Sequence, residues 1–342
     1  MRTNTGANVD GRFDTKQRGG ALRAAALALL AAAALNALAL GFEFESPGQW
    51  LAGYGANWLD TLSGGAGTGI AALGMCCAMI VGGADLSAGA VSALAAALAA
   101  AVAGGVAGWP AGLAAALAAA AALAAGAALG GLNGLAASAG KVNPLFATLC
   151  MAGLVCPLTL ILNPGAQGGV TSFANLSDAA GLAAPILCWA VMAAITAAAL
   201  RLTPFGRRMY AIGDDARAAR LCGVRVGCVR CGAYALAGFA AALAGLASPP
   251  GGADLYAAAG YARVLDAVAA AALGGASLSG GKGCVEGALL GTLVVLALSN
   301  LLGVAGVSGP PLLACKAAVA LVAVLLGPGG AAYRGGQRDT AV

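Results

Sequence analysis

Long apolar runs, separated by short polar or glycine-rich segments, dominate this chain. A helix of about 20 apolar residues crosses the hydrocarbon core of a bilayer, so each run is a candidate membrane span. One run, 264–275, is short enough for a re-entrant segment. The pattern predicts an all-α polytopic membrane protein with about ten transmembrane helices, at 21–41, 62–82, 87–108, 111–132, 145–163, 181–202, 232–249, 264–275, 284–305 and 311–327.

Composition agrees with a membrane protein and removes most enzyme chemistry. The 342 residues are 61% hydrophobic and 9% charged, whereas a soluble domain has about 25% charged residues. There is no histidine, which removes the usual general base and the commonest metal ligand. Lys282 follows two glycines but precedes Gly283, so no Walker A motif is present. Cys228 and Cys231 form a lone C-x-x-C pair that does not predict a zinc site. We therefore expect no catalytic residue, bound metal or cofactor on this chain.

Positive charge predicts the orientation in the membrane. Lys and Arg gather in the leader, in the segment 203–231 and in the tail, and such segments face the cytoplasm. Six predicted spans lie between the leader and the segment 203–231, and four lie between that segment and the tail. Because both numbers are even, the three basic segments lie on the same side of the membrane. The segments 42–60 and 163–180 contain no Lys or Arg and are expected outside. This predicts a cytoplasmic leader (1–20), a transmembrane domain (21–330) and a cytoplasmic tail (331–342).

The segment 203–231 has features beyond its charge. Thr203-Pro204 is expected to end the preceding helix. Asp214 or Asp215 can cap a short helix over Ala216–Leu221 that ends at Gly223. A solvated basic loop that only enforces topology is the alternative. The Gly, Ala and Tyr content instead favours a surface on which a partner docks.

Residues 82–89 place Asp85 and Ser87 between two apolar runs. A carboxylate at membrane depth costs about 2.5–3.5 kcal/mol and persists only where protein or water satisfies it. A loop at the membrane surface is the alternative position. The pattern recurs at 274–281, Gly-Gly-Ala-Ser-Leu-Ser-Gly-Gly, as it does in transporters built from two related halves.

Five blocks of the sequence, in order along the chain, form a recognisable set: 72–75 with 82–91, 131–134, 141–149, 206–213 with 218–223, and 265–270 with 273–283. They resemble the permease subunits of bacterial ABC sugar importers of the ribose/galactose/xylose type. Two departures are visible. Leu145 separates Pro144 from Phe146, where the family usually has an aromatic directly after the proline, and Asp214-Asp215 stands where Gly-Asn is common.

The resemblance implies an ABC importer permease fold with a central cytoplasmic coupling loop at 203–231, set in the bacterial inner membrane. Its implied partners are a second permease copy or paralogue, a cytoplasmic ABC ATPase that binds ATP and magnesium, and a periplasmic or extracellular sugar-binding protein; membrane lipid surrounds it and nucleic acid plays no part. The residues expected to couple to the ATPase are Gly206, Arg207, Tyr210, Gly213, Ala219 and Gly223.

A sugar crossing the membrane needs hydrogen-bond donors and acceptors. The polar residues expected along its path are Asp85, Ser87, Asn133, Asn143 and Ser277. Asn133 could instead bond two helices together, and Ser277 could bond its own turn. Two other functions stay open at this point: a self-sufficient secondary transporter or channel for a small polar solute, and a structural membrane protein.

Overall fold

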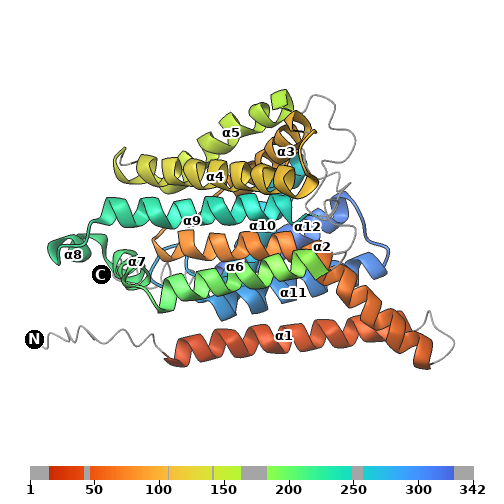
Figure 1. Cartoon of the computed structure of the whole chain (residues 1–342). Helices are drawn as coiled ribbons and strands as arrows, with labels where there is room; N and C mark the ends of the chain where they lie inside the picture. The colour runs from red at the N-terminus through yellow and green to blue at the C-terminus, as the bar shows by residue number, and fades with distance from the viewer. Residues whose placement is uncertain are drawn as a thin grey trace, which may run out of the picture.

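The structure, a computed structural model, describes residues 15–41, 47–106, 108–140, 142–162, 183–248 and 257–326. These segments contain helices and turns and no strand (Figure 1). The helices are α1 (Thr15–Gly41), α2 (Pro47–Ile80), α3 (Ala88–Gly105), α4 (Ala111–Ser138), α5 (Pro144–Leu162), α6 (Ala183–Arg201), α7 (Pro204–Asp214), α8 (Ala216–Leu221), α9 (Val226–Leu246), α10 (Ala257–Leu273), α11 (Val285–Val304) and α12 (Pro310–Leu326).

Each of the ten predicted spans coincides with one of these helices, and α7 and α8 fall in the segment between the sixth and seventh. Within the described residues, seven helices are long and apolar enough to cross a membrane: α2, α3, α4, α5, α6, α9 and α11. The chain is therefore an all-α, multi-pass membrane protein.

Three boundaries differ from the prediction. The helix α2 begins at Pro47 and so occupies most of the segment 42–60, which was predicted as a loop; Gly48, Gly55 and Asp60 lower its hydropathy without ending the helix. The helix α9 begins at Val226 and takes the last six residues of the predicted loop 203–231. The helix α10 has 17 residues, so the short predicted span 264–275 is the second part of a longer helix.

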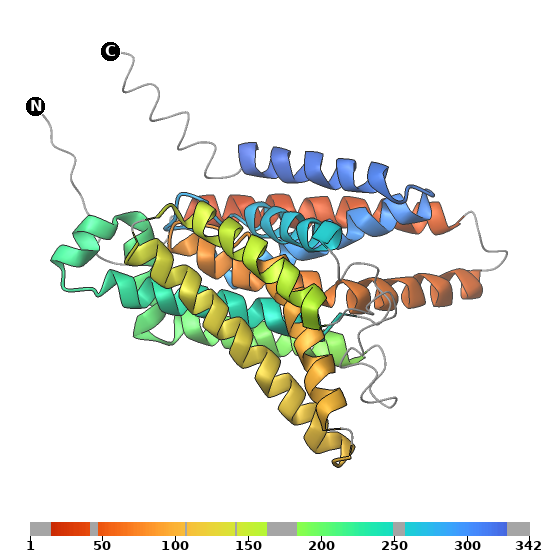
Figure 2. The same ribbon diagram turned by 90° about the horizontal axis from the view of Figure 1, so that it is seen from above.

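The core of the bundle forms around α2. It packs against α6, α9, α10 and α11, while α3, α4 and α5 form a further layer over α9 (Figure 1). Ile70, Leu73, Met75 and Met79 of α2 are almost fully buried. Seen from above, α3 and α4 slant away from the direction of α2 (Figure 2). The short helices α7 and α8 lie together at one end of the bundle, called here the α7 end.

Glycines bring α4 and α9 into direct backbone contact. The sequence contains Gly126-x-x-x-Gly130, and the stripe continues to Gly134 one turn later. A Cβ atom on Gly130 would overlap the carbonyl oxygen of Tyr234, and one on Gly238 would overlap that of Gly126. Small residues at this spacing let helices approach closely where lipid gives no hydrophobic driving force. This glycine motif therefore brings α4 and α9 together.

A buried ion pair joins α10 to α12. Lys316 Nζ donates to Asp266 Oδ2 at 2.9 Å, and the two side chains are 17% and 11% exposed. One turn away on α10, Arg263 Nη1 donates to Ser92 Oγ of α3 at 3.1 Å. Charged side chains of α10 therefore connect it to two other helices inside the bundle.

Replacing Lys316 by Met should lower the stability of the purified protein by about 3–5 kcal/mol, because Asp266 is left as a buried charge without its partner. The double variant K316M/D266N should recover most of that loss. The temperature of unfolding in detergent measures both. Glu286→Gln is the control: the Arg201–Glu286 pair is 52% and 40% exposed, and such pairs contribute about 0–1 kcal/mol. Equal losses in K316M and in the double variant would show that the pair itself matters little.

Candidate functional site: a buried polar turn beside the coupling helices

The turn between α2 and α3 carries a buried hydrogen-bonded cluster. Asp85, Ser87 and Asn133 have exposed fractions of 1%, 0% and 1%. Asp85 Oδ1 accepts from Ser87 N at 2.9 Å and from Ser87 Oγ at 2.5 Å. Asn133 Nδ2 of α4 donates to Ser87 Oγ at 2.9 Å. Three residues predicted separately thus form one cluster, and Asp85 lies inside the protein rather than in an exposed loop.

Three oxygen atoms at this cluster have no hydrogen-bond partner: Asp85 Oδ2, Asn133 Oδ1 and the hydroxyl of Tyr234. Tyr234 belongs to α9 and is 1% exposed. Its hydroxyl presses against Gly83, where an added Cβ would overlap it. Buried polar atoms without partners cost about 1–3 kcal/mol each, so the cluster holds hydrogen-bonding capacity that this conformation does not use.

The turn between α10 and α11 shares two local features with the first turn. At matching positions of the sequence repeat, Ser277 Oγ accepts from Ser279 N at 3.3 Å and Asp85 Oδ1 accepts from Ser87 N. Each turn also has a glycine of positive φ two residues after its helix ends, Gly82 (+83°) and Gly275 (+88°). These two glycines are not paired by the repeat, which aligns Gly82 with Gly274, so the sequence repeat corresponds to a shared hydrogen-bond pattern and not to two identical backbone turns. Ser277 is buried and bonds its own turn, which is the local role considered for it.

The two turns touch one another at the α7 end. Gly281 N donates to the carbonyl of Ile80 at 3.0 Å, which joins the second turn to the last residue of α2. Asn143 lies nearby but is exposed, and its Oδ1 accepts from Leu145 N at 3.0 Å at the start of α5. Among the described residues, no hydrogen bond links Asn143 or Ser277 to the Asp85 cluster.

The helices α7 and α8 form as their sequence predicts. Thr203 caps α7, Pro204 is its first residue, and Thr203 Oγ1 accepts from Gly206 N. Asp215 caps α8, which spans the predicted residues Ala216–Leu221. Hydrogen bonds from the N–H groups of Ala218 and Arg217 lower the pKa of the Asp215 carboxyl. Gly223 follows with a φ of +82°, a conformation that favours glycine.

One face of α7 packs against the bundle. Gly206, Tyr210 and Gly213 are spaced i, i+4 and i+7, so they share this face. A Cβ on Gly206 would overlap the carbonyl of Leu200, and one on Gly213 would overlap both the carbonyl of Ile80 and the nitrogen of Gly281. The Tyr210 hydroxyl donates to the carbonyl of Gly283 at 2.9 Å. The close approach that the sequence suggested for a partner is thus made within the chain.

The opposite face of these helices is exposed and basic. Arg207 and Gly223 are exposed, whereas Ala219 is buried. Leu221 is 91% exposed. Of the six predicted coupling residues, two therefore face outward and four pack inward, and Arg208 and Leu221 join the outward face. The helical spacing relative to the inward-facing residues could have identified Arg208 and Leu221 as outward-facing.

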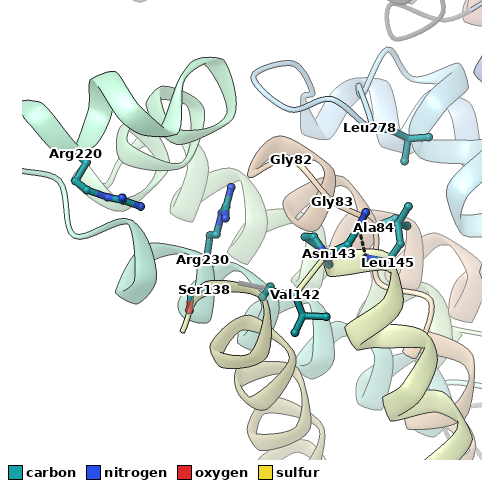
Figure 3. Close-up of a pocket in the computed structure, with 12 residues that line it drawn as sticks. Gly82, Gly83, Ala84, Ser138, Val142, Asn143, Leu145, Arg220, Arg230 and Leu278 are labelled. Carbon is teal, nitrogen blue, oxygen red and sulfur yellow. Dashed lines mark hydrogen bonds between the residues drawn. The ribbon is translucent and has the colours of Figure 1, made fainter. Parts of the chain in front are cut away.

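A cavity of about 640 Å³ opens between α8, α9 and the first turn (Figure 3). Residues 82–84 form one wall, and Arg220 and Arg230 project from the other side. Asn143 is in its lining. The cavity thus lies between the first turn, which carries Asp85, and the helices α8 and α9.

The chain is similar to known transport proteins. Residues 57–327 match the family described as the permease component of branched-chain amino acid transport systems. The chain belongs to this permease family. No solved structure matches it.

Several relatives of the permease are named as sugar import proteins. It is 39% identical over 277 residues to the ribose import permease protein RbsC of Bacillus subtilis, covering 79% of this chain and 84% of the relative. It is 34% identical to RbsC of Haemophilus influenzae over 278 residues, with the same two coverages of 79% and 84%. The xylose transport system permease protein XylH of Haemophilus influenzae is 39% identical over 125 residues, 36% of this chain and 33% of that protein.

Tyr234 was not among the predicted site residues. The available signal was a tyrosine as the third residue of the predicted span 232–249, among Ala, Gly and Leu, because a buried hydroxyl needs a partner there. Its position became meaningful only when the fold placed it against Gly83 in the permease.

Gly83→Ala should destabilise the permease, because the new methyl group would overlap the Tyr234 hydroxyl and lie 2.9 Å from Pro144 Cβ. Adding Tyr234→Phe should restore part of the lost stability, since it removes the first clash but not the second. Tyr234→Phe alone should raise stability by about 1–3 kcal/mol, because it removes a buried hydroxyl that has no hydrogen-bond partner. Unfolding temperatures in detergent compare the variants, and Gly153→Ala, with open space around it, is the control. If Y234F gave G83A no relief, the placement of the Tyr234 side chain would be wrong.

Proposed function

We propose that this chain is the transmembrane permease subunit of an ATP-binding-cassette importer that passes a sugar, a pentose, hexose or related polyol, from an extracytoplasmic binding protein into the cytoplasm. It works in the bacterial inner membrane with a second permease copy or paralogue. ATP and magnesium bind to a separate cytoplasmic ATPase. Both chain termini and the α7 end face the cytoplasm.

The similarity to the ribose permeases is the observation that carries this proposal, because it extends over 79% of the chain and 84% of the relative. The described structure supports the division of labour. It offers a basic, exposed surface on α7 and α8 for a motor protein, and the family is one of transport permeases rather than of enzymes.

In this proposal, α7 transmits force directly to both turns. Its outward face binds the ATPase, while Gly213 on its inward face touches the end of α2 and the turn before α11. The backbone contact leaves no side chain between them to absorb a displacement. A shift of α7 therefore moves the Asp85 turn and the Ser277 turn together, as a two-state permease requires.

The Asp85 cluster supplies hydroxyl-binding groups on the path. Its three unpartnered oxygens suit a polyol, whose hydroxyl groups both donate and accept. They are covered in the described conformation, so the sugar meets them only after the turns move. Sugar specificity is expected to rest largely with the binding protein.

The test is uptake of labelled ribose into vesicles that contain the permease, its ATPase and its binding protein. Uptake should require ATP and stop when the ATPase is catalytically inactive. Ribose uptake that persisted with an inactive ATPase would instead favour a self-sufficient transporter. A pentose, a hexose and inositol compared in the same assay would identify the sugar class.

Gly213→Ala should reduce ATP-dependent uptake by about tenfold, within the range expected for a contact that couples two sites. Tyr210→Phe, which removes the hydrogen bond to Gly283, should give a smaller loss while leaving the backbone in place. Gly153→Ala should behave as wild type, because nothing lies near its added methyl group. All variants are compared at equal amounts of purified complex. Full uptake by G213A would show that this contact does not carry the movement.

A further inference from the structure

The cavity beside the first turn is strongly asymmetric in charge. Its twelve lining residues include Arg220 and Arg230 and no Asp or Glu. Within the part of the chain that the structure describes, neither arginine makes an ion pair. The Nε atom of Arg230 is buried and has no hydrogen-bond acceptor. Two cationic groups therefore face the same space without an anion between them.

The buried Nε atom of Arg230 is costly to leave without an acceptor, whereas Arg220 is exposed. A buried guanidinium nitrogen without an acceptor loses its hydration and gains nothing in return. Lipid-facing basic residues on a membrane protein would instead turn their charged ends toward water. Arg230 is on the first turn and a half of α9 and is directed into the cavity rather than away from it (Figure 3).

The chemistry of the cavity suits an oxyanion such as a phosphate group. The guanidinium fork binds phosphate oxygens through two parallel hydrogen bonds. Ser138 and Asn143 add uncharged polar groups, and Val142, Pro144 and Leu278 give an apolar wall. A volume of about 640 Å³ holds a phosphate with a short organic substituent.

We propose that this cavity is a binding site for a phosphate group, held by Arg220 and Arg230. The phosphate is carried either by a soluble phosphate ester or by an anionic lipid headgroup. A bound phosphate joins α8 to α9 and lies against residues 82–84 of the first turn. The two arginines are not among the residues expected on the polyol path, whereas Asn143 is common to both.

The test measures phosphate binding to the full chain purified in detergent. One arm titrates delipidated protein with glycerol 3-phosphate and with inorganic phosphate. The other arm measures phosphatidylglycerol retained or rebound, against phosphatidylcholine, by native mass spectrometry. Arg230→Gln and Arg220→Gln should each weaken binding by about tenfold or more, as expected for lost hydrogen bonds between charged groups.

Arg208→Gln is the matched control, because Arg208 is exposed on α7 and does not line the cavity. Binding in the first arm alone assigns the site to a soluble ester, and binding in the second alone assigns it to a lipid. Two results would overturn the proposal: no saturable binding in either arm, or an equal loss of binding in R208Q. Unfolding temperatures of the apo variants confirm that R220Q and R230Q fold. Because the assay involves no transport, its outcome is independent of the proposed import function.

Discussion

The contact of Gly213 with Ile80 and Gly281 holds together the two functional parts of this permease. One part is the pair of short helices, α7 and α8, whose outward face is basic. The other is the pair of turns that interrupt the bundle before α3 and α11. Since backbone meets backbone at this point, and Gly281 N also donates to the Ile80 carbonyl, neither part can shift without displacing the other. The glycines of α7 thus allow close packing within the chain, whether or not a partner protein is bound.

Polar groups inside the bundle are of two kinds, those whose hydrogen bonds are complete and those that leave some oxygen atoms without a partner. The Lys316–Asp266 pair and the Arg263–Ser92 bond are satisfied and connect α10 to its neighbours. The Asp85 cluster is satisfied on one side, through Ser87 and Asn133, and leaves oxygen atoms unused on the other. A complete network stabilises one arrangement, whereas an incomplete one has groups in reserve for a second arrangement or for a ligand. This difference separates the polar residues that connect α10 to its neighbours from the cluster for which we propose a role in transport.

The sequence predicted most helices well because apolar length is a strong signal in a membrane. It also predicted α8 and its cap, since Asp215, Ala216–Leu221 and Gly223 follow local rules that need no tertiary information. Local rules failed at α2, where glycines and Asp60 resemble a loop but the helix continues from Pro47 and packs on α1. They also failed to give the direction of each side chain. A glycine at position 206 or 213 is equally expected where a helix packs against a partner protein and where it packs within its own chain. Only the fold showed that Gly206 and Gly213 pack within the chain. Tyr234 and Gly83 are 151 positions apart in the numbering, so no local pattern relates them.

The unusual length of α2 has a consequence for how this protein sits in its surroundings. Its 34 residues extend for about 51 Å, more than the roughly 30 Å of a hydrocarbon core. Trp50 and Tyr54 stack near its first turns with ring centroids 5.5 Å apart, and Trp50 Nε1 donates to the carbonyl of Ala37 at 3.2 Å. Such amphipathic rings prefer the headgroup level. The helix bends along its length (Figure 1) and joins the aromatic pair near its start to the carboxylate turn that follows its end, so the level at which the aromatic pair lies in a membrane sets the depth of that turn.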